Sequence, residues 1–99
     1  MENIEYKTLV INQDNKLCYI DNQEIHLTKK EYELLKFFLE NPNYIHSRES
    51  LIEKVWNKQV SERTIDTNIM RLRNKLGPYK NNIYTRLGFG YGFNMEVSC

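Results

Sequence analysis

The sequence has no long apolar run, few cysteines and no secretion signal. Every apolar stretch falls far short of the roughly 18 residues that a membrane-spanning helix needs. The N-terminal residues MENIEYK contain neither the basic segment nor the apolar stretch of a signal peptide. Cys18 and Cys99 have no CxxC partner and no histidine nearby, so neither is predicted to bind a metal. These absences favour a cytoplasmic protein, whose thiols are reduced by default, and argue against a membrane partner.

Recognisable catalytic groups are also missing. His26 and His46 are twenty residues apart, in a predicted strand and a predicted loop, without the spacing of metal ligands. No serine or cysteine has the base and the orienting group that a catalytic nucleophile needs. We therefore expect no enzymatic activity, no metal and no cofactor.

The charged residues are unevenly distributed along a chain of 99 residues, a length typical of one domain. Residues 1–53 hold six Lys/Arg and ten Asp/Glu, a balance of −4, whereas residues 54–99 hold eight and three, a balance of +5. Such a split predicts a face that meets a polyanion. Charge alone leaves open the alternative of an ordinary polar surface.

The first 27 residues have the composition of short strands. Residues 7–12 (KTLVIN), 16–20 (KLCYI) and 23–27 (QEIHL) are rich in strand-forming residues, and the segments QDN and DN between them favour turns. A small antiparallel sheet over residues 1–27 is the simplest interpretation.

Three helices and a hairpin are predicted next. Thr28 and Glu31 fit a capping box, which starts a helix that ends near Asn41-Pro42. Ser47 caps a second helix, and a third runs from residue 61 or 62 to Leu76, where Gly77-Pro78 stops it. Residues 83–87 and 91–95, joined by GFG, are predicted to form a β-hairpin. The expected fold is α+β, with a sheet (1–27), three helices (28–77) and a hairpin (82–95).

The third predicted helix has one apolar side and one basic side. At 100° per residue its apolar stripe faces the core, and after Asp66 the opposite side has no acidic residue. The stripe consists of Ile65, Ile69, Leu72 and Leu76, and the opposite side of Arg63, Thr64, Thr67, Met70, Arg71 and Asn74, flanked by Asn68, Arg73 and Lys75. Guanidinium groups with short polar side chains suit the DNA major groove, where Arg bonds guanine and Thr meets the thymine methyl. The alternative is a solvated helix with a chance excess of basic residues.

The second and third helices form a helix-turn-helix, in which the second of the pair enters the groove. Trp56, at their junction, is more often a core residue than a phosphate contact. The glycine pattern of GFGYGF is not a phosphate loop, because no helix follows it. A hairpin after a helix-turn-helix is a wing, in which glycine allows a tight turn and Thr85 and Arg86 reach the DNA backbone or the minor groove.

These segments resemble a known family. The stretches LTKKEYELLKFFLENPNYIHSRESLIEKVW, SERTIDTNIMRLRNKLG and IYTRLGFGYGF closely resemble the OmpR/PhoB-type winged-helix domain of bacterial response regulators, over residues 7–95. The resemblance implies specific binding to double-stranded promoter DNA, often as head-to-tail pairs on direct repeats, and regulation of transcription. Members usually carry a phosphorylatable receiver domain before this one.

The resemblance also assigns roles to residues. Thr67 and Arg71 match base-reading positions; Arg63, Asn68 and Arg73 match phosphate-contacting positions; Thr85 matches a backbone contact from the wing. From the exposed helix face we add Thr64 and Lys75 as phosphate contacts, and Arg86 as a wing contact.

Three positions depart from the family pattern. Met70 stands where a basic residue is common, and Leu87 where the wing often carries an arginine that enters the minor groove. The connection 57–61 (NKQVS), which in this family often touches RNA polymerase, is shorter than usual. The rival function is a winged helix that binds protein. That function needs an apolar exposed face on the third helix, where only Met70 is apolar, so the sequence favours DNA.

Overall fold

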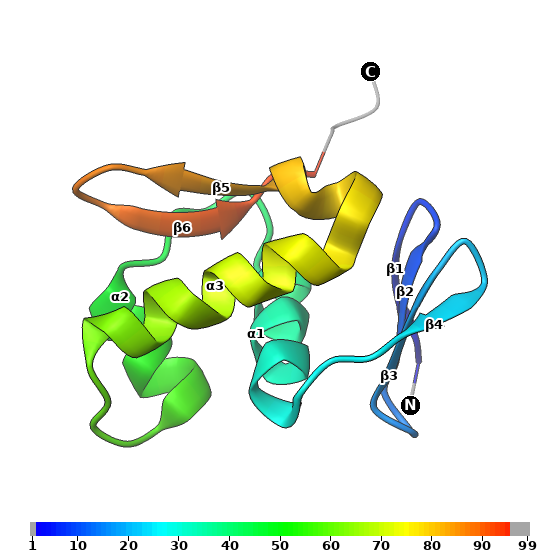
Figure 1. Cartoon of the computed structure of the whole chain (residues 1–99), viewed down its shortest axis with the longest axis horizontal. Helices are drawn as coiled ribbons and strands as arrows, with labels where there is room; N and C mark the ends of the chain where they lie inside the picture. Colours follow the sequence, from blue (N-terminus) through cyan, green and yellow to red (C-terminus); the bar gives the residue numbers. More distant parts are fainter. Residues whose placement is uncertain (1, 96–99) are drawn as a thin grey trace.

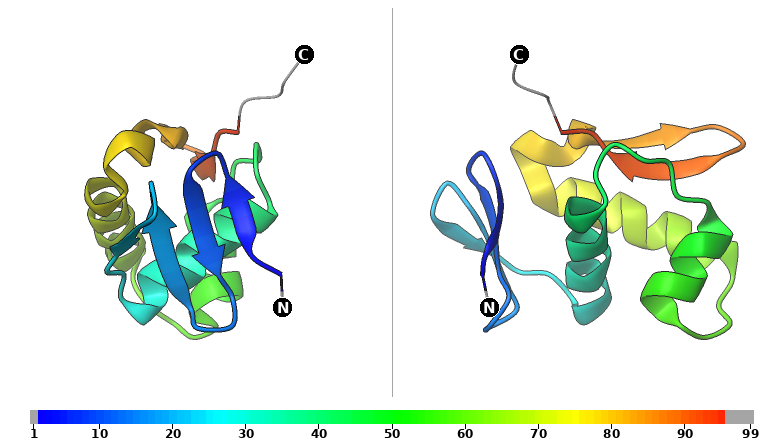
Figure 2. Two further views of the ribbon diagram at one scale, coloured as in Figure 1. Left: turned by 90° about the vertical axis from the view of Figure 1, so that its right-hand side faces the viewer. Right: turned by 180° about the vertical axis from the view of Figure 1, so that it is seen from behind.

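In the computed structural model, which describes residues 2–95, a four-stranded sheet lies at one end of a group of helices, and a two-stranded hairpin lies above the helices in the view of Figure 1. The antiparallel sheet has the order β1-β2-β3-β4, and Figure 2 shows the helices on one face of it. Its strands are β1 (Ile4–Tyr6), β2 (Leu9–Asn12), β3 (Leu17–Ile20) and β4 (Gln23–Ile25). This arrangement confirms the predicted fold class.

The first strand was not predicted. The run 7–12 is broken because Lys7 has a φ of 55°, in the left-handed region, so residues 7 and 8 form a turn and Ile4–Tyr6 pairs with β2 as an additional strand. A positive φ at lysine is uncommon and has no signal in the residue type.

Helix α1 (Lys29–Glu40) begins with the predicted capping box. The Glu31 N–H donates to Thr28 Oγ1 (3.2 Å), and the Thr28 N–H donates back to Glu31 Oε1 (2.8 Å). The helix ends at Asn41, before Pro42, as the sequence indicates.

Helix α2 (Arg48–Leu51) is capped by Ser47 as predicted, but it continues as a π-helical turn, η1 (Ile52–Trp56). Asn57 ends this turn with a φ of 55°. Trp56 is buried, which confirms its core position. The wider turn was not predicted from the apolar spacing.

Helix α3 (Glu62–Leu76) is capped by Ser61. Its four predicted core residues, Ile65, Ile69, Leu72 and Leu76, are all at most 1% exposed. A 3-10 segment that was not predicted, η2 (Gly77–Asn82), follows the helix, and the hydroxyl of its Tyr79 accepts a hydrogen bond from the Thr8 N–H (2.9 Å). The apolar stripe of α3 therefore faces the core, and the opposite side of the helix faces outward.

The hairpin consists of β5 (Ile83–Arg86) and β6 (Gly90–Phe93), joined by a turn at residues 87–89. Only Gly88 (φ 83°) serves the turn itself. A Cβ on Gly90 would lie 2.0 Å from the backbone oxygen of His46, and one on Gly92 would lie 2.4 Å from that of Tyr44. The expectation that glycine only relieves the turn is thus incomplete, because Gly90 and Gly92 let the hairpin pack against residues 44–47.

Two sequence expectations concern the cysteines and the membrane. Cys18 is buried in the core, and burial raises the pKa of its thiol to about 11; Cys99 lies outside the described residues. Within residues 2–95, no helix is long and apolar enough to cross a membrane.

Candidate nucleic-acid interface

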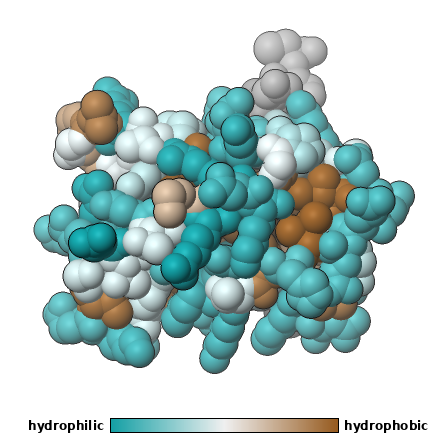
Figure 3. All heavy atoms as spheres, in the orientation of Figure 1, coloured by the Kyte–Doolittle hydropathy of each residue, from teal (hydrophilic) through white to brown (hydrophobic). Residues whose placement is uncertain are grey.

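The outward face of α3 is hydrophilic. Arg63 and Arg71 are exposed, and Thr67 and Asn68 are half-buried. Figure 3 shows mostly hydrophilic atoms over this helix. A shallow hollow in the face is lined by Ser61, Arg63, Thr64, Thr67, Asn68 and Arg71. Five of the nine predicted DNA-contacting residues therefore come together on one surface.

The first turn of α3 orders part of this surface. The Thr64 N–H donates to the capping Ser61 Oγ (3.3 Å), and the two hydroxyls are 3.2 Å apart. The Asn68 side-chain amide donates to the Thr64 carbonyl (2.9 Å), which fixes its orientation along the helix. Short polar side chains here leave room for a duplex to approach the helix closely.

The guanidinium group of Arg73 forms hydrogen bonds within the protein. Its Nε donates to the Ile83 carbonyl (2.9 Å) and its Nη2 to Thr85 Oγ1 (2.6 Å). The structure thus brings together two residues predicted to touch the DNA backbone, but bonds them to each other. This contact fastens the hairpin to α3.

Because of these bonds, we expect Arg73→Ala to lower the free energy of unfolding by about 1–2 kcal/mol. Thr85→Val, which removes only one of the two bonds, is the matched comparison and should cost less. Urea denaturation measures both. An Arg73→Ala variant with unchanged stability would contradict this role.

Lys75 contacts helix α1 and does not line the hollow that Arg63 and Arg71 share. Its ammonium group donates to Glu31 Oε1 on α1 (2.6 Å), and the Glu31 side chain is only 1% exposed. Burial raises the pKa of Glu31, but the hydrogen bonds from Lys75 and Thr28 outweigh burial, so the pKa lies below its usual value. Lys75 therefore neutralises a buried carboxylate.

A hydrogen-bonded cluster at the junction of α2, α3 and β6 was missed in the sequence. Asp66 Oδ1 accepts bonds from Arg48 Nε (2.7 Å) and from the Tyr91 hydroxyl (2.5 Å). The hydrogen bond from Arg48 is the main reason why the pKa of Asp66 lies below its usual value. Arg48 and Arg73 both lie over the Tyr91 ring, with centroid distances of 5.5 and 5.8 Å. The sequence signal was that Asp66 is the single acid in the basic segment 63–77, where a carboxylate favours a cationic partner.

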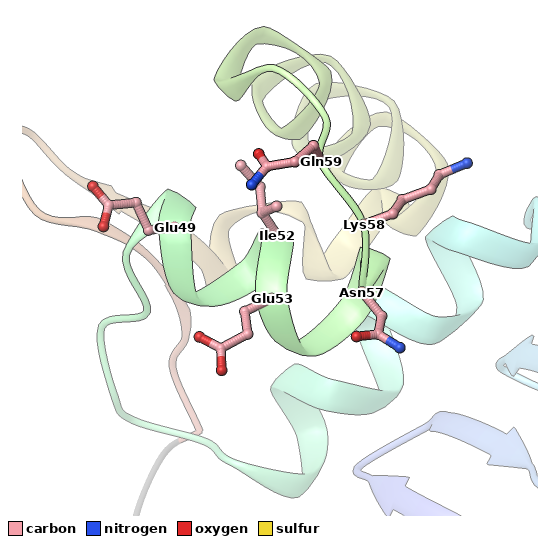
Figure 4. A pocket seen from close by; sticks show the side chains of 6 residues that line it. All are labelled: Glu49, Ile52, Glu53, Asn57, Lys58 and Gln59. Carbon is pink, nitrogen blue, oxygen red and sulfur yellow. The ribbon is translucent and has the colours of Figure 1, made fainter.

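A second hollow, of about 490 Å³, lies between α2, η1 and the connection 57–61 (Figure 4). It is lined by Glu49, Ile52, Glu53, Asn57, Lys58 and Gln59. The figure shows Ile52 and Gln59 pointing toward each other and Lys58 projecting outward. This hollow carries carboxylates and lies outside the basic face of α3.

The family model described as transcriptional regulatory protein, C terminal, matches residues 22–93. The chain belongs to this family. It is an OmpR/PhoB-type domain, which confirms the resemblance carried by its helix and hairpin motifs.

Named relatives and solved structures are similar to this OmpR/PhoB-type domain. The transcriptional regulatory protein SrrA of Staphylococcus aureus is 40% identical over 94% of this chain and 41% of its own length, so the chain spans about two fifths of that relative. The DNA-binding domain of the response regulator AdeR, solved with an intercistronic region, is 29% identical with a TM-score of 0.83, over 93% of this chain and 99% of that one. The Thermotoga maritima response regulator DrrB, an OmpR/PhoB homolog, is 35% identical with a TM-score of 0.83, over 93% and 44%.

Proposed function

We propose that this OmpR/PhoB-type domain binds specific sequences of double-stranded DNA, with α3 in the major groove, and thereby regulates transcription. The observation that carries the proposal is the outward face of α3, where two guanidinium groups flank hydroxyl and amide side chains. This combination of donors and acceptors can distinguish base pairs by their major-groove edges. The AdeR domain, a structural neighbour of this chain, was solved with DNA.

Within this function some of the predicted residues contact DNA and others hold the contacting residues in place. Thr67 and Arg71 read bases, and Arg63, Thr64 and Asn68 contact phosphates beside them. Arg73 and Lys75 have partners inside the protein, so we assign them, with Thr85, to holding the reading face in place. Arg86 is exposed on the hairpin and remains a wing contact.

The first test selects bound fragments from random duplex DNA and then compares variants on the selected site. Arg71→Ala is expected to cost about 1–3 kcal/mol on that site and to relax the base preference at one position, because Arg pairs bidentately with guanine. Fluorescence anisotropy against selected and random duplex measures both effects. An unchanged ratio of the two affinities would sink the base-reading role of Arg71.

Arg63→Ala is the matched control, because it removes the same group from the same face of α3, about two turns earlier. It should weaken selected and random duplex about equally and reduce the slope of log K against log[salt] by about one. This result separates phosphate contact from base reading.

A protein-binding winged helix is the alternative. On the exposed face of α3 only Met70 is a large exposed apolar residue, and it stands among polar neighbours. A protein partner would bind with a weak salt dependence, whereas DNA binding loses affinity linearly in log[salt]. A salt titration therefore distinguishes the two functions.

Further partners are part of the proposal. Two copies would sit head-to-tail on direct repeats in promoter DNA of the bacterial cytoplasm. RNA polymerase would meet the connection 57–61, where Figure 4 shows Lys58 projecting outward beside the hollow. Lys58→Ala in a transcription assay tests this contact, because it should change transcript yield without changing DNA affinity.

A further inference from the structure

The turn of the hairpin carries two exposed apolar side chains. Leu87 is 88% exposed and Phe89 63%, and Gly88 lies between them. Figure 3 shows hydrophobic atoms gathered at the tip of the hairpin, at the upper left. Single apolar residues are common on protein surfaces, but two on one three-residue turn make a projecting apolar end. We refer to Leu87 and Phe89 as the wing tip.

The wing tip is held in a fixed place beside α3. Arg73 binds β5, as described above, and the Tyr91 backbone exchanges two hydrogen bonds with His46, of 2.8 and 3.0 Å. The turn itself is closed by a bond from the Phe89 N–H to the Arg86 carbonyl (2.9 Å). The base of the hairpin is therefore braced from both sides, and its apolar end points outward.

The charge around the wing tip is positive. The Arg86 guanidinium lies 5.2 Å from the centroid of the Phe89 ring, and residues 83–95 contain no Asp or Glu. The ring face attracts the guanidinium, which keeps a positive charge at the wing tip. This arrangement matches a groove of duplex DNA, in which phosphates form the walls and the base edges and sugars offer apolar surface.

We propose that Leu87 and Phe89 enter the minor groove next to the site of α3 as an apolar wedge and bend the duplex. The proposal rests on the proposed function, because it takes DNA as the ligand. Apolar side chains inserted between base steps unstack them partially and kink the duplex toward the major groove. Flexible pyrimidine–purine steps deform most easily, so the selected sites should carry such a step at a fixed distance from the bases read by Arg71.

An apolar wedge and an arginine differ in how they make the DNA affinity depend on salt concentration. Leu87 and Phe89 carry no charge, so their contact with DNA releases no counterions. Removing them should weaken binding and reduce bending while leaving the salt slope unchanged. Introducing an arginine, as in Leu87→Arg, should steepen the slope by about one and reduce the bend.

The experiment compares the whole chain with the double variant Leu87→Ser/Phe89→Ser on a selected duplex of about 30 base pairs, which is nearly straight when free because the persistence length of DNA is about 150 base pairs. Energy transfer between dyes on the duplex ends reports bending, and anisotropy reports affinity. The double variant should bind about 10-fold more weakly, as expected for losing partial burial of two apolar side chains, and should leave the duplex straighter. Tyr44→Ser, which removes another exposed ring, should change neither quantity.

The experiment distinguishes a failure of the wedge from a failure of the proposed function. If the double variant bends and binds DNA like the unaltered chain, the wedge is overturned while the proposed function stands. The wedge is also overturned if the variant keeps its DNA affinity but loses self-association in sedimentation, because the wing tip then docks on a second copy. If the unaltered chain binds no duplex, the proposed function itself fails. Thermal unfolding monitored by circular dichroism confirms that each variant is folded.

Discussion

Replacing Gly90 by alanine is expected to lower the free energy of unfolding by at least about 3 kcal/mol, at the upper end of the cost of overpacking. The new Cβ would lie 2.0 Å from the His46 backbone oxygen, 2.7 Å from the His46 carbonyl carbon and 2.9 Å from the Ser47 Cα. All three are backbone atoms, so no side-chain rotation relieves the clash. The hairpin would have to move away from residues 44–47, which breaks the two backbone bonds between His46 and Tyr91.

Gly88→Ala is the matched control for this prediction. Gly88 and Gly90 both have a positive φ, of 83° and 145°, but a Cβ on Gly88 meets nothing within 4 Å. It should cost only the backbone strain of about 1 kcal/mol. Urea denaturation gives both values, and equal costs for the two variants would show that the close approach to His46 is unimportant.

Lys75→Met should destabilise the protein by about 2–3 kcal/mol at pH 7. It leaves the carboxylate of Glu31 buried without its cation, and breaking a fully buried ion pair costs about 3–5 kcal/mol. The lower figure applies because the Lys75 side chain is 37% exposed, so water screens the pair in part. Lys58→Met, which removes an exposed lysine from the connection 57–61, is the control and should cost less than about 0.5 kcal/mol.

The pH dependence of Lys75→Met identifies Glu31 as the cause. In the unaltered protein the pKa of Glu31 is lowered, so its contribution to stability is present above the usual glutamate pKa and is lost as the pH falls through the folded-state value. In the variant, burial without the cation raises this pKa, and protonation then relieves the cost. The stability difference should therefore be largest at neutral pH and shrink as the pH falls from the raised pKa of the variant toward the lowered pKa of the unaltered protein. A difference that is constant with pH would assign the loss to packing instead.

Local features were predicted well because their causes lie within a few residues. The Thr28–Glu31 capping box and the buried stripe of α3 depend on spacings of three and four residues, which the sequence displays directly. The order of sheet, helices and hairpin followed from the change of apolar period and from turn residues. The family resemblance then indicated how these elements pack.

Features that depend on distant partners were not predictable in the same way. Lys75 has the pattern of an exposed cation, but its partner Glu31 lies 44 residues earlier and already had a role in the capping box. Asp66 has its partners on two other elements, Arg48 at the start of α2 and Tyr91 on β6, which lie 18 and 25 residues away in the sequence. The additional strand β1 depends on the backbone conformation of Lys7, which its residue type does not indicate.

The internal use of Arg73 and Lys75 has a consequence for how long one copy stays on DNA. Arg73 and Lys75 are bonded to other parts of the protein, so of the four cations on α3 the proposed DNA contact relies on Arg63 and Arg71. Few released counterions mean short residence on random sequence, which permits a fast search along the chromosome. A second copy bound to an adjacent repeat would lengthen the time that the pair stays on the DNA. The reason is that the second binding event takes place at a high effective concentration.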